Sequence, residues 1–411
     1  MTNGLPRLAW QYLWARPLTA ALNLLLLTLG LASIAFLILA RDQVDRAFER
    51  DLAGIDAVVG AKGSPMQLIL AGVFHLDVPP GNIPLAEARR IAEHPQVAQF
   101  IPLSLGDNLQ GWRIVGTTTD YLSLYGATLA HGAPWQAPMQ AVLGDAVARG
   151  SGLDVGARFV GAHGLGVGGA VHDSTPYEVT GVLRPCGCVL DRLVLTATES
   201  VWFVHDEMHT DKDLSADERA ELQAALDAER EITIGLVRYR SPLAAASFPR
   251  FVNSITPLQA AAPAVEVTRL LSLIGQGTQV LRALAGVLLV VAALSVFIAL
   301  WSAVRERRAD LALLRLLGAP PRRVAALLLA EAAWLALLAS ALGLLAAQGL
   351  AALAGRWWGD AALPTLVQAG AWPPALAWVP VLAAGAALLA AGLPALAAYR
   401  VDVHTLLNPR S

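Results

Sequence analysis

Four long stretches without charged residues constrain this chain more than any other feature. They cover residues 17–40, 283–304, 332–355 and, inside a longer apolar run, about 375–398. A helix that crosses the hydrocarbon core of a membrane needs roughly 20 apolar residues, so each stretch is long enough. Only 15% of the 411 residues are charged, compared with about 25% in soluble domains. The sequence therefore predicts a membrane α-helical protein with four transmembrane helices.

The first stretch is expected to stay in the protein as a transmembrane helix, TM1. Its apolar run is longer than the roughly 7–15 residues of a signal-peptide core, and no small-x-small cleavage pattern precedes Arg41. Residues 1–16 before it place apolar side chains at helical spacing, with Trp10 and Trp14 beside them. This pattern predicts a cytoplasmic amphipathic helix in the membrane interface.

Arginines in the short loops predict the orientation. The loop 305–323 is rich in arginine, whereas the loop from 356 to about 373 holds Arg356 alone. Positive residues collect in cytoplasmic loops, so 305–323 is expected in the cytoplasm. With four spans, both termini are then cytoplasmic and residues 41–275 lie outside. The net charge of −2 gives no reason to expect nucleic acid as a partner.

The segment 41–275 is long enough for a large α/β extracytoplasmic domain inserted between the first and second spans (one span, then three). At its ends, 41–51 and 265–281 are expected to extend the spanning helices as stalks, which either couple membrane motion to the domain or are plain extensions. The expected strands are 57–59, 100–105, 112–116, 157–161, 177–183 and 232–240, and the expected helices are 85–93, 141–148, 196–205 and 215–229.

The loop after the second span carries a distinctive motif. Residues 305–319 read Arg-Glu-Arg-Arg-Ala-Asp-Leu-Ala-Leu-Leu-Arg-Leu-Leu-Gly-Ala. This run resembles the corresponding loop of FtsX/MacB-type ABC transporter permeases, in which basic residues, an acidic residue and an apolar helix with one basic residue precede Gly-Ala. Residues 329–332 and 399–407 are also similar to that family. More weakly, 142–183 echoes the motif order of its MacB-like periplasmic core.

The resemblance implies how the chain is divided and assembled. It implies a MacB-like periplasmic α/β domain with stalks over 41–275 and an FtsX-like permease domain over 276–411. The latter would hold TM2 at about 280–304, a coupling loop at 305–323, TM3 at about 324–355, TM4 at about 375–398 and a short cytoplasmic tail. It further implies a homodimer in the bacterial inner membrane bound to two ATPase subunits. The residues expected to couple to the ATPase are Arg308, Asp310, Leu311, Leu314, Arg315, Leu317, Gly318 and Ala319.

The residues of this motif also give a physical reason for docking. Leu311, Leu314 and Leu317 share a helix face at i, i+3 and i+6, and Gly318 suits the end of that helix. An amphipathic helix between two spans rests on lipid headgroups or is covered by a partner protein. The resemblance favours the partner protein.

Several motifs of enzymes and carriers are absent from the sequence. It has no G-x-x-x-x-G-K-[ST] loop for nucleotide, and no Ser-His-Asp, H-E-x-x-H or G-x-S-x-G arrangement. We therefore expect no enzyme activity and no cofactor in this chain, with ATP and Mg²⁺ held by the partner ATPase. The spans hold almost no ionisable residues, which disfavours an ion-driven carrier.

Two sets of residues outside the spans are candidate sites. Lys62, Gly63 and Ser64 form either a loop for an anionic ligand or partner, or a solvated turn between stalk and domain. The second candidate site combines two cysteines with two histidines. Cysteine thiolates together with imidazoles suit Zn²⁺ or Cu⁺, and His209 follows His205 at i+4, which places both on one face of a helix. The cysteines could instead be oxidised to a disulfide or be small buried residues, and two are too few for a disulfide framework. The weak metal candidates are Cys186, Cys188, His205 and His209.

The leading interpretation is therefore a permease subunit that couples ATP hydrolysis by a separate subunit to its periplasmic domain. In the family this serves export, extraction or mechanotransmission, and the domain is expected to meet a periplasmic adaptor, lipoprotein or hydrolase. The alternatives are a regulatory membrane protein that transports nothing and controls a periplasmic partner, and metal-linked transport through the periplasmic domain.

Overall fold

The computed structural model of the protein describes residues 4–52, 54–164, 169, 175–207, 229–306, 313, 316–357 and 369–399. The chain divides into two compact units. The first, called the spanning unit below, joins Met1–Asp45 to Leu273–Ser411, and the second, the outer unit, is Arg46–Ser272.

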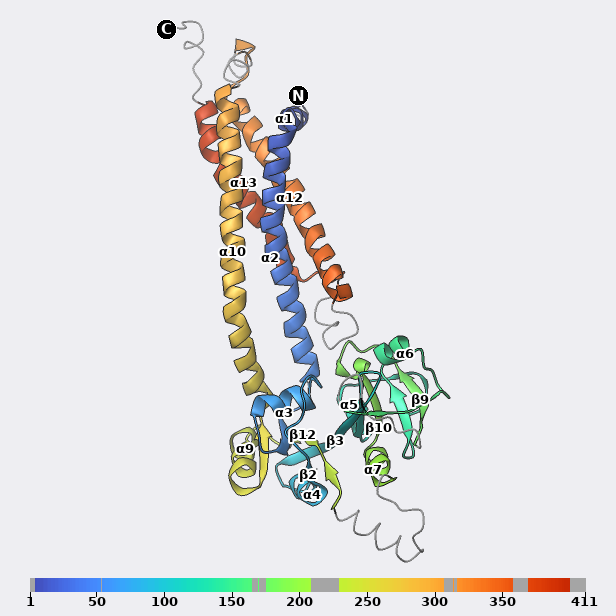
Figure 1. Cartoon of the computed structure of the whole chain (residues 1–411). Coiled ribbons are helices and arrows are strands. Elements are labelled where there is room, and N and C mark those ends of the chain that lie inside the picture. Colours follow the sequence, from blue (N-terminus) through green and yellow to red (C-terminus); the bar gives the residue numbers. More distant parts are fainter. Residues whose placement is uncertain are drawn as a thin grey trace, which may run out of the picture. The chain divides into compact units, whose positions relative to one another are not determined.

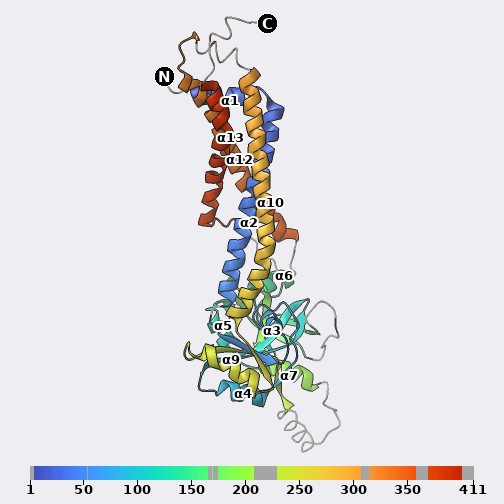
Figure 2. The ribbon, with the colours of Figure 1, turned by 90° about the vertical axis from the view of Figure 1, so that its left-hand side faces the viewer.

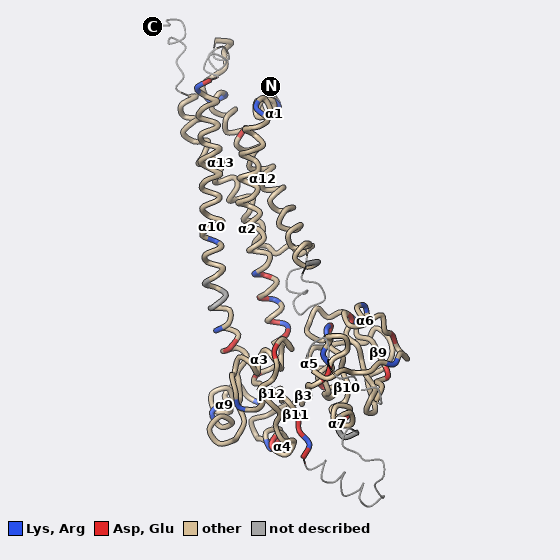
Figure 3. The backbone as a smooth tube through the Cα atoms, in the orientation of Figure 1, with Lys and Arg blue, Asp and Glu red and all other residues tan. Residues whose placement is uncertain are grey.

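Long apolar helices make up the spanning unit. In the described part of the chain, four helices are long and apolar enough to cross a membrane, as the sequence predicts. The middle of α12 and of α13 carries almost no charge (Figure 3). The helices, drawn in Figure 1, are α1 (Leu5–Trp14), α2 (Pro17–Asp51), α10 (Pro263–Glu306), α12 (Pro321–Trp357) and α13 (Trp378–Tyr399), with a 3₁₀ turn η2 (Pro374–Ala377) before α13.

Helices α2 and α10 are longer than a membrane requires. They have 35 and 44 residues, whereas about 20 suffice to span the hydrocarbon core. Residues 46–51 of α2 and 263–272 of α10 belong to the outer unit. Each stalk expected from the sequence is therefore part of one unbroken helix shared by both units.

Small residues let the spanning helices approach one another closely. A Cβ added at Gly30 would lie 3.3 Å from the backbone nitrogen of Leu289, and one added at Gly343 would lie 3.0 Å from Leu31 Cβ. Glycine at these two positions permits α2 to approach α10 and α12, as small residues do at helix contacts in lipid. Figure 2 shows α2 and α10 side by side from a second direction.

Helix α1 packs against α12. The rings of Trp10 and Trp334 are 5.1 Å apart, and Trp334 Nε1 donates a hydrogen bond of 3.1 Å to the carbonyl of Pro6. Leu13 is buried, whereas Trp14 is 40% exposed. The amphipathic helix thus buries one face in the bundle and leaves tryptophan rings at its edge, where a membrane interface suits them.

One mixed β-sheet organises the outer unit. Among the described residues it has 11 strands, with the order β13-β1-β12-β3-β4-β10-β6-β9-β5, while β7 pairs with β9 and β8 with β3. β10 is parallel to β4, β6 is parallel to β9, and β11 pairs with β2 in a separate small sheet. The strands are β1 (Ala57–Ala61), β2 (Ile83–Pro84), β3 (Val97–Leu109), β4 (Trp112–Thr117), β5 (Leu129–Gly132), β6 (Gln140–Leu143), β7 (Arg158–Phe159), β8 (Ala162–His163), β9 (Tyr177–Leu183), β10 (Leu193–Ala197), β11 (Glu231–Ile232), β12 (Ile234–Tyr239) and β13 (Leu258–Ala261).

Helices pack against both faces of this sheet at β1. Val58 belongs to a core cluster with Leu68 of α3, whereas the next residue, Val59, belongs to another with Phe248 of α9. Successive residues of a strand point to opposite faces, so the two clusters lie on opposite sides of the sheet. The helices are α3 (Pro65–Gly72), α4 (Leu85–Ala92), α5 (Asp120–Leu124), α6 (Asp145–Ser151), η1 (Val189–Arg192), α7 (Thr198–Glu207) and α9 (Ala244–Ile255). The predicted fold class, four spanning helices with a large α/β domain, is confirmed.

The structure corrects some of the predicted elements. Residues 141–148, expected as one helix, are the end of β6 followed by α6, because Ala141, Val142 and Leu143 are fully buried in the ladder with β10. Pairing in the sheet here overrides helix propensity. The helix expected at 196–205 begins as β10, the strand expected at 157–161 shortens to β7, and residues 215–228 lie outside the described residues.

Candidate functional site

The predicted coupling motif is described only at its end. Leu317 is 84% exposed, and Gly318 has φ of +92°. A positive φ favours glycine, so Gly318 ends the helix and Ala319 leads into α12 at Pro321. Outside the described residues lie Arg308, Asp310, Leu311, Leu314 and Arg315.

Two exposed leucines of the coupling loop were missed by the sequence reasoning. Leu313 and Leu316 are 57% and 59% exposed, and the Leu317 N–H donates a 3.0 Å hydrogen bond to the Leu313 carbonyl. Residues 313, 316 and 317 follow the helical spacing i, i+3 and i+4, which is the signal that could have found them. Exposed apolar side chains that gather in this way are typical of an interaction surface.

The Lys62 loop is a short turn between β1 and α3. Lys62, Gly63 and Ser64 are all exposed, and the Ser64 carbonyl accepts the Leu68 N–H at 3.1 Å to start α3. A Cβ added at Gly63 would lie 2.7 Å from Pro80 Cβ, so the turn rests against the loop around Pro80. A ligand or partner at this turn stays a prediction.

The structure joins two of the four candidate metal ligands to each other. Cys186 and Cys188 form a disulfide, which leaves no thiolate for a metal in this state. His205 lies in α7, and its side chain and His209 are outside the described part of the chain. No group of three or more His, Cys, Asp and Glu suited to a metal occurs among the described residues. Metal binding stays a prediction, and it requires the reduced cysteines.

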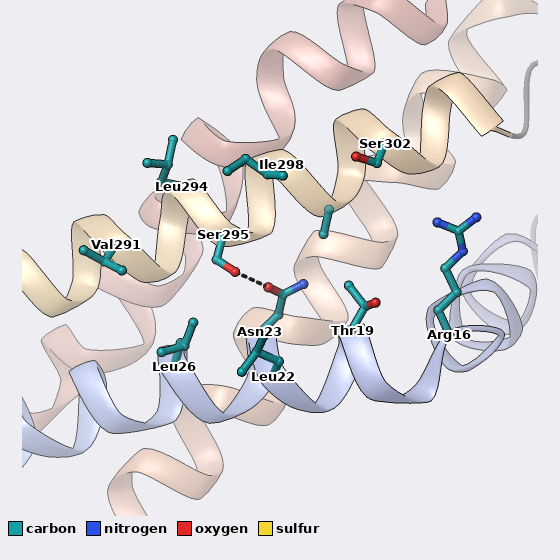
Figure 4. A pocket seen from close by; sticks show the side chains of 11 residues that line it. Arg16, Thr19, Leu22, Asn23, Leu26, Val291, Leu294, Ser295, Ile298 and Ser302 are labelled. Atoms are coloured by element: carbon teal, nitrogen blue, oxygen red, sulfur yellow. Dashed lines mark hydrogen bonds between the residues drawn. The ribbon is translucent and has the colours of Figure 1, made fainter.

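Helices α2 and α10 enclose a groove of about 480 Å³ in the spanning unit. Its lining residues recur every three or four positions on both helices, so each helix contributes one face. The groove has a polar end near Arg16, Thr19 and Ser302 and an apolar end near Leu26 and Val291 (Figure 4). Between these ends lie Leu22, Asn23, Leu294, Ser295, Ile298 and Ala299.

A hydrogen bond crosses the middle of this groove. The Ser295 hydroxyl donates to Asn23 Oδ1 at 2.7 Å, and Asn23 is only 3% exposed (Figure 4). A polar side chain in a spanning helix is costly without a partner, so the bond ties α2 and α10 together at this level. At the polar end, Arg16 forms an ion pair with Glu306, the last residue of α10.

In the outer unit, the Cys186–Cys188 disulfide closes a turn that Asp191 holds in place. Asp191 Oδ1 accepts the N–H of Cys186 at 2.9 Å, and its Oδ2 accepts the N–H of Gly187 at 2.7 Å. Burial raises the pKa of Asp191, and the two backbone hydrogen bonds oppose that effect. Gly187 has φ of +66°, and a Cβ added there would lie 2.6 Å from Arg50 Nη1.

The residue after the disulfide is bonded to the last residue of α2. The Val189 N–H donates to Asp51 Oδ1 at 3.0 Å, and the Tyr125 hydroxyl donates to the Asp51 carbonyl at 2.9 Å. Burial lowers the pKa of the nearby Arg192, and the charges of Asp51 and Asp191 act against that. The disulfide turn, η1 and the end of α2 therefore share one buried polar network.

A histidine that is not among the predicted site residues lies beside this network. His75 is buried in the loop after α3, and its Nε2 lies 3.0 Å from the Tyr121 hydroxyl. Burial lowers the pKa of His75 to about 3, and the positive charges of Arg113 and Arg192 act in the same direction. The imidazole therefore stays neutral at ordinary pH.

Four apolar spans, with an α/β unit inserted after the first, define a multi-pass membrane protein with one large domain outside the bundle. Two family models match the chain: the FtsX-like permease C-terminal model at residues 282–403 and the MacB-like periplasmic core domain model at residues 20–234. The second match alone covers more than half of the chain. The chain therefore belongs to the FtsX/MacB-type ABC transporter permeases.

Solved structures of two outer domains are similar to part of the chain. One is the crystal structure of the periplasmic region of MacB from Actinobacillus actinomycetemcomitans, with a sequence identity of 10% and a TM-score of 0.34. The alignment covers 54% of this chain and 95% of the MacB chain. The other is the extracellular domain of the noncanonic ABC-type transporter YknZ from Gram-positive bacteria, with a sequence identity of 12% and a TM-score of 0.30. The alignment covers 50% of this chain and 98% of the YknZ chain. The comparison with curated proteins gave no match. The family assignment rests on the two family models.

Proposed function

We propose that this chain is the transmembrane subunit of an ABC transporter, in which a separate ATPase subunit drives movement of the outer unit. The observation that carries the proposal is the FtsX-like permease match at 282–403 in a chain whose α2 and α10 run unbroken from the spanning unit into the outer unit. ATP and Mg²⁺ are bound by the ATPase subunit. This movement serves export, extraction or mechanical signalling to a periplasmic adaptor, lipoprotein or hydrolase.

The ends of α2 and α10 adjoin two neighbouring strands. α2 ends at Asp51, shortly before β1, and α10 begins at Pro263, directly after β13. β1 and β13 are paired antiparallel, with Val58 opposite Ala261. Movement of one helix against the other would therefore act on adjacent strands of one sheet, whose core is closely packed and transmits strain.

In this proposal the ATPase acts on residues 305–323, which run from the end of α10 to the start of α12. The exposed leucines at 313, 316 and 317 supply an apolar contact surface, and the surrounding arginines supply charge. The chain lies in the bacterial inner membrane as a homodimer, with this loop and both termini in the cytoplasm. The arginine-rich loop supports that orientation.

Co-purification tests the docking step. Arg315→Glu or Leu314→Asp should reduce recovery of the ATPase with this chain by about tenfold or more, because each change places negative charge on the docking helix. Arg250→Glu is a matched control, since Arg250 is an exposed arginine of α9 in the outer unit. Unchanged recovery with both loop variants would contradict the assignment of this loop.

A further inference from the structure

The Cys186–Cys188 disulfide closes too short a loop to contribute much to the stability of the fold. A disulfide stabilises a fold mainly by restricting the unfolded chain, and the effect grows with the length of the loop that it closes. Only one residue, Gly187, lies between the two cysteines of this disulfide. It therefore restricts little of the unfolded chain.

We propose that Cys186 and Cys188 form a thiol–disulfide exchange site for an extracytoplasmic dithiol protein, and that the state of this pair is relayed to the end of α2. The inference goes beyond the proposed transport function and uses from it only the extracytoplasmic position of the outer unit. Disulfides persist in such oxidising compartments, where proteins that exchange them also act.

The two sulfurs differ in accessibility, which sets the direction of attack. Cys186 is partly exposed, whereas Cys188 is 7% exposed and belongs to the core cluster of the outer unit. A thiolate of the incoming dithiol attacks Cys186 Sγ, the bond between the two sulfurs breaks, and Cys188 leaves as a thiolate that takes up a proton. The second thiol of the partner, on losing its proton, then attacks the mixed disulfide and releases Cys186. Two electrons and two protons pass to this chain, and the partner dithiol becomes a disulfide.

Two opposite charges adjoin this site. Asp191 Oδ1 lies 3.3 Å from Cys186 Sγ, and its negative charge disfavours a thiolate there. The guanidinium of Arg50 lies against Gly187, and its positive charge favours a thiolate. Asp191 also accepts both N–H groups of the turn, which stabilises the closed form. The two residues therefore push the exchange equilibrium in opposite directions.

The relay to α2 passes through one residue. Cys188 is followed by Val189, whose N–H is bonded to the Asp51 carboxylate at the end of α2. The Cys188 N–H itself lies 3.2 Å from Cys186 Sγ, so opening the disulfide releases the backbone just before Val189. Reduction should therefore loosen the attachment of α2 to η1.

A redox titration of the full-length protein in lipid nanodiscs tests the exchange. The protein is equilibrated with mixtures of reduced and oxidised glutathione, and free thiols are trapped with a maleimide that adds measurable mass. We expect a reversible two-electron transition under native conditions. Asp191→Asn should shift the dithiol:disulfide ratio by about threefold to tenfold towards the dithiol, and Arg50→Gln by a similar factor towards the disulfide.

Asp154→Asn is the matched control, because the Asp154 side chain is 74% exposed and its partner is His131. It should leave the ratio unchanged. A disulfide that reacts with glutathione only after denaturation would overturn the proposal, and so would shifts of the same sign for Asp191→Asn and Arg50→Gln. The titration needs no ATPase, so its outcome is independent of the docking test.

Hydrogen exchange tests the relay. Amides at the end of α2 and at Val189 should exchange at least about threefold faster after reduction, and in Cys186→Ser/Cys188→Ser to the same extent without reductant. Strands β9 and β12 serve as an internal reference that should not change. Equal exchange at α2 in both redox states would overturn the relay.

Discussion

At the residue scale, His75 makes the folding of the outer unit sensitive to acid. Its pKa of about 3 in the folded protein lies below its ordinary value of 6.5. Below pH 6.5 the unfolded chain binds a proton at His75 that the folded protein does not, so the contribution of this residue to stability falls as the pH decreases from 6.5 towards 3. Asp51, whose pKa is raised by burial to about 6, contributes in the opposite direction below that pH. We expect this group to contribute a loss on the order of 1 kcal/mol per pH unit within that window for His75.

His75→Asn separates this effect from other acid effects. Asparagine tolerates the positive φ of 53° at this position and does not titrate. Hydrogen exchange of β1 and β4, corrected for the intrinsic pH dependence of exchange, should show a shallower loss of stability between pH 6 and pH 4 than in the unchanged protein. His131→Asn, at a side chain 58% exposed, should keep the original slope. An identical slope in His75→Asn would show that this imidazole is not the group responsible.

Single residues of the disulfide network show what the sequence could and could not predict. The pair Cys186 and Cys188 was found from spacing alone, and its oxidation was one of the alternatives. Asp51 is 138 positions from Val189, to which it is bonded, so no local pattern connects them. Asp191 is close in sequence, but its role depends on a glycine at positive φ that only the backbone reveals.

At the element scale, the bond between Asn23 and Ser295 fixes how α2 lies against α10. Hydrogen bonds between spanning helices contribute about 0.6 kcal/mol on average. A double-mutant cycle with Asn23→Ala and Ser295→Ala should therefore give a coupling energy of about 0.5–1.5 kcal/mol in reversible unfolding of the protein from lipid or detergent.

Ser340→Ala provides the matched control for this cycle. Ser340 is 7% exposed, and its hydroxyl donates to the Leu337 carbonyl of its own helix at 2.9 Å. Combined with Asn23→Ala it should show no coupling energy. A coupling energy near zero for Asn23 with Ser295 would mean that their bond does not hold α2 to α10.

Elements whose sequence alternates clearly between apolar and polar residues were predicted well. Elements whose structure depends on pairing with strands far away in the sequence were not. The strand expected at 177–183 is β9, where buried Tyr177 and Val179 alternate with the less buried Glu178 and Thr180. The helix expected at 141–148 was wrong over its first half, because β6 is buried between β9 and β10 and reads as a continuous apolar run. α3 and α9 were not predicted, and the apolar residues that they bury also fit other local structures.

At the scale of the whole molecule, the four spans followed from the length of the apolar stretches, and the inserted α/β domain followed from the length of 41–275 and its alternating strand and helix patterns. The order of strands did not, since neighbours such as β3 and β12 are far apart in the sequence. Orientation rests on arginines: the loop 305–323 is rich in them, and the loop from 356 to about 373 has one. The proposed coupling requires the outer unit and this loop to face different compartments, because force from an ATPase bound at the loop would have to cross the membrane.

Labelling of single cysteines in intact cells tests this requirement most directly. In a Cys186→Ser/Cys188→Ser background, Arg322→Cys marks the start of α12 at the end of residues 305–323, and Arg149→Cys marks the outer unit at a side chain 72% exposed. A maleimide that cannot cross the cytoplasmic membrane should label position 149 in intact cells, and position 322 only after that membrane is permeabilised. Labelling of both positions from the same side would contradict the account.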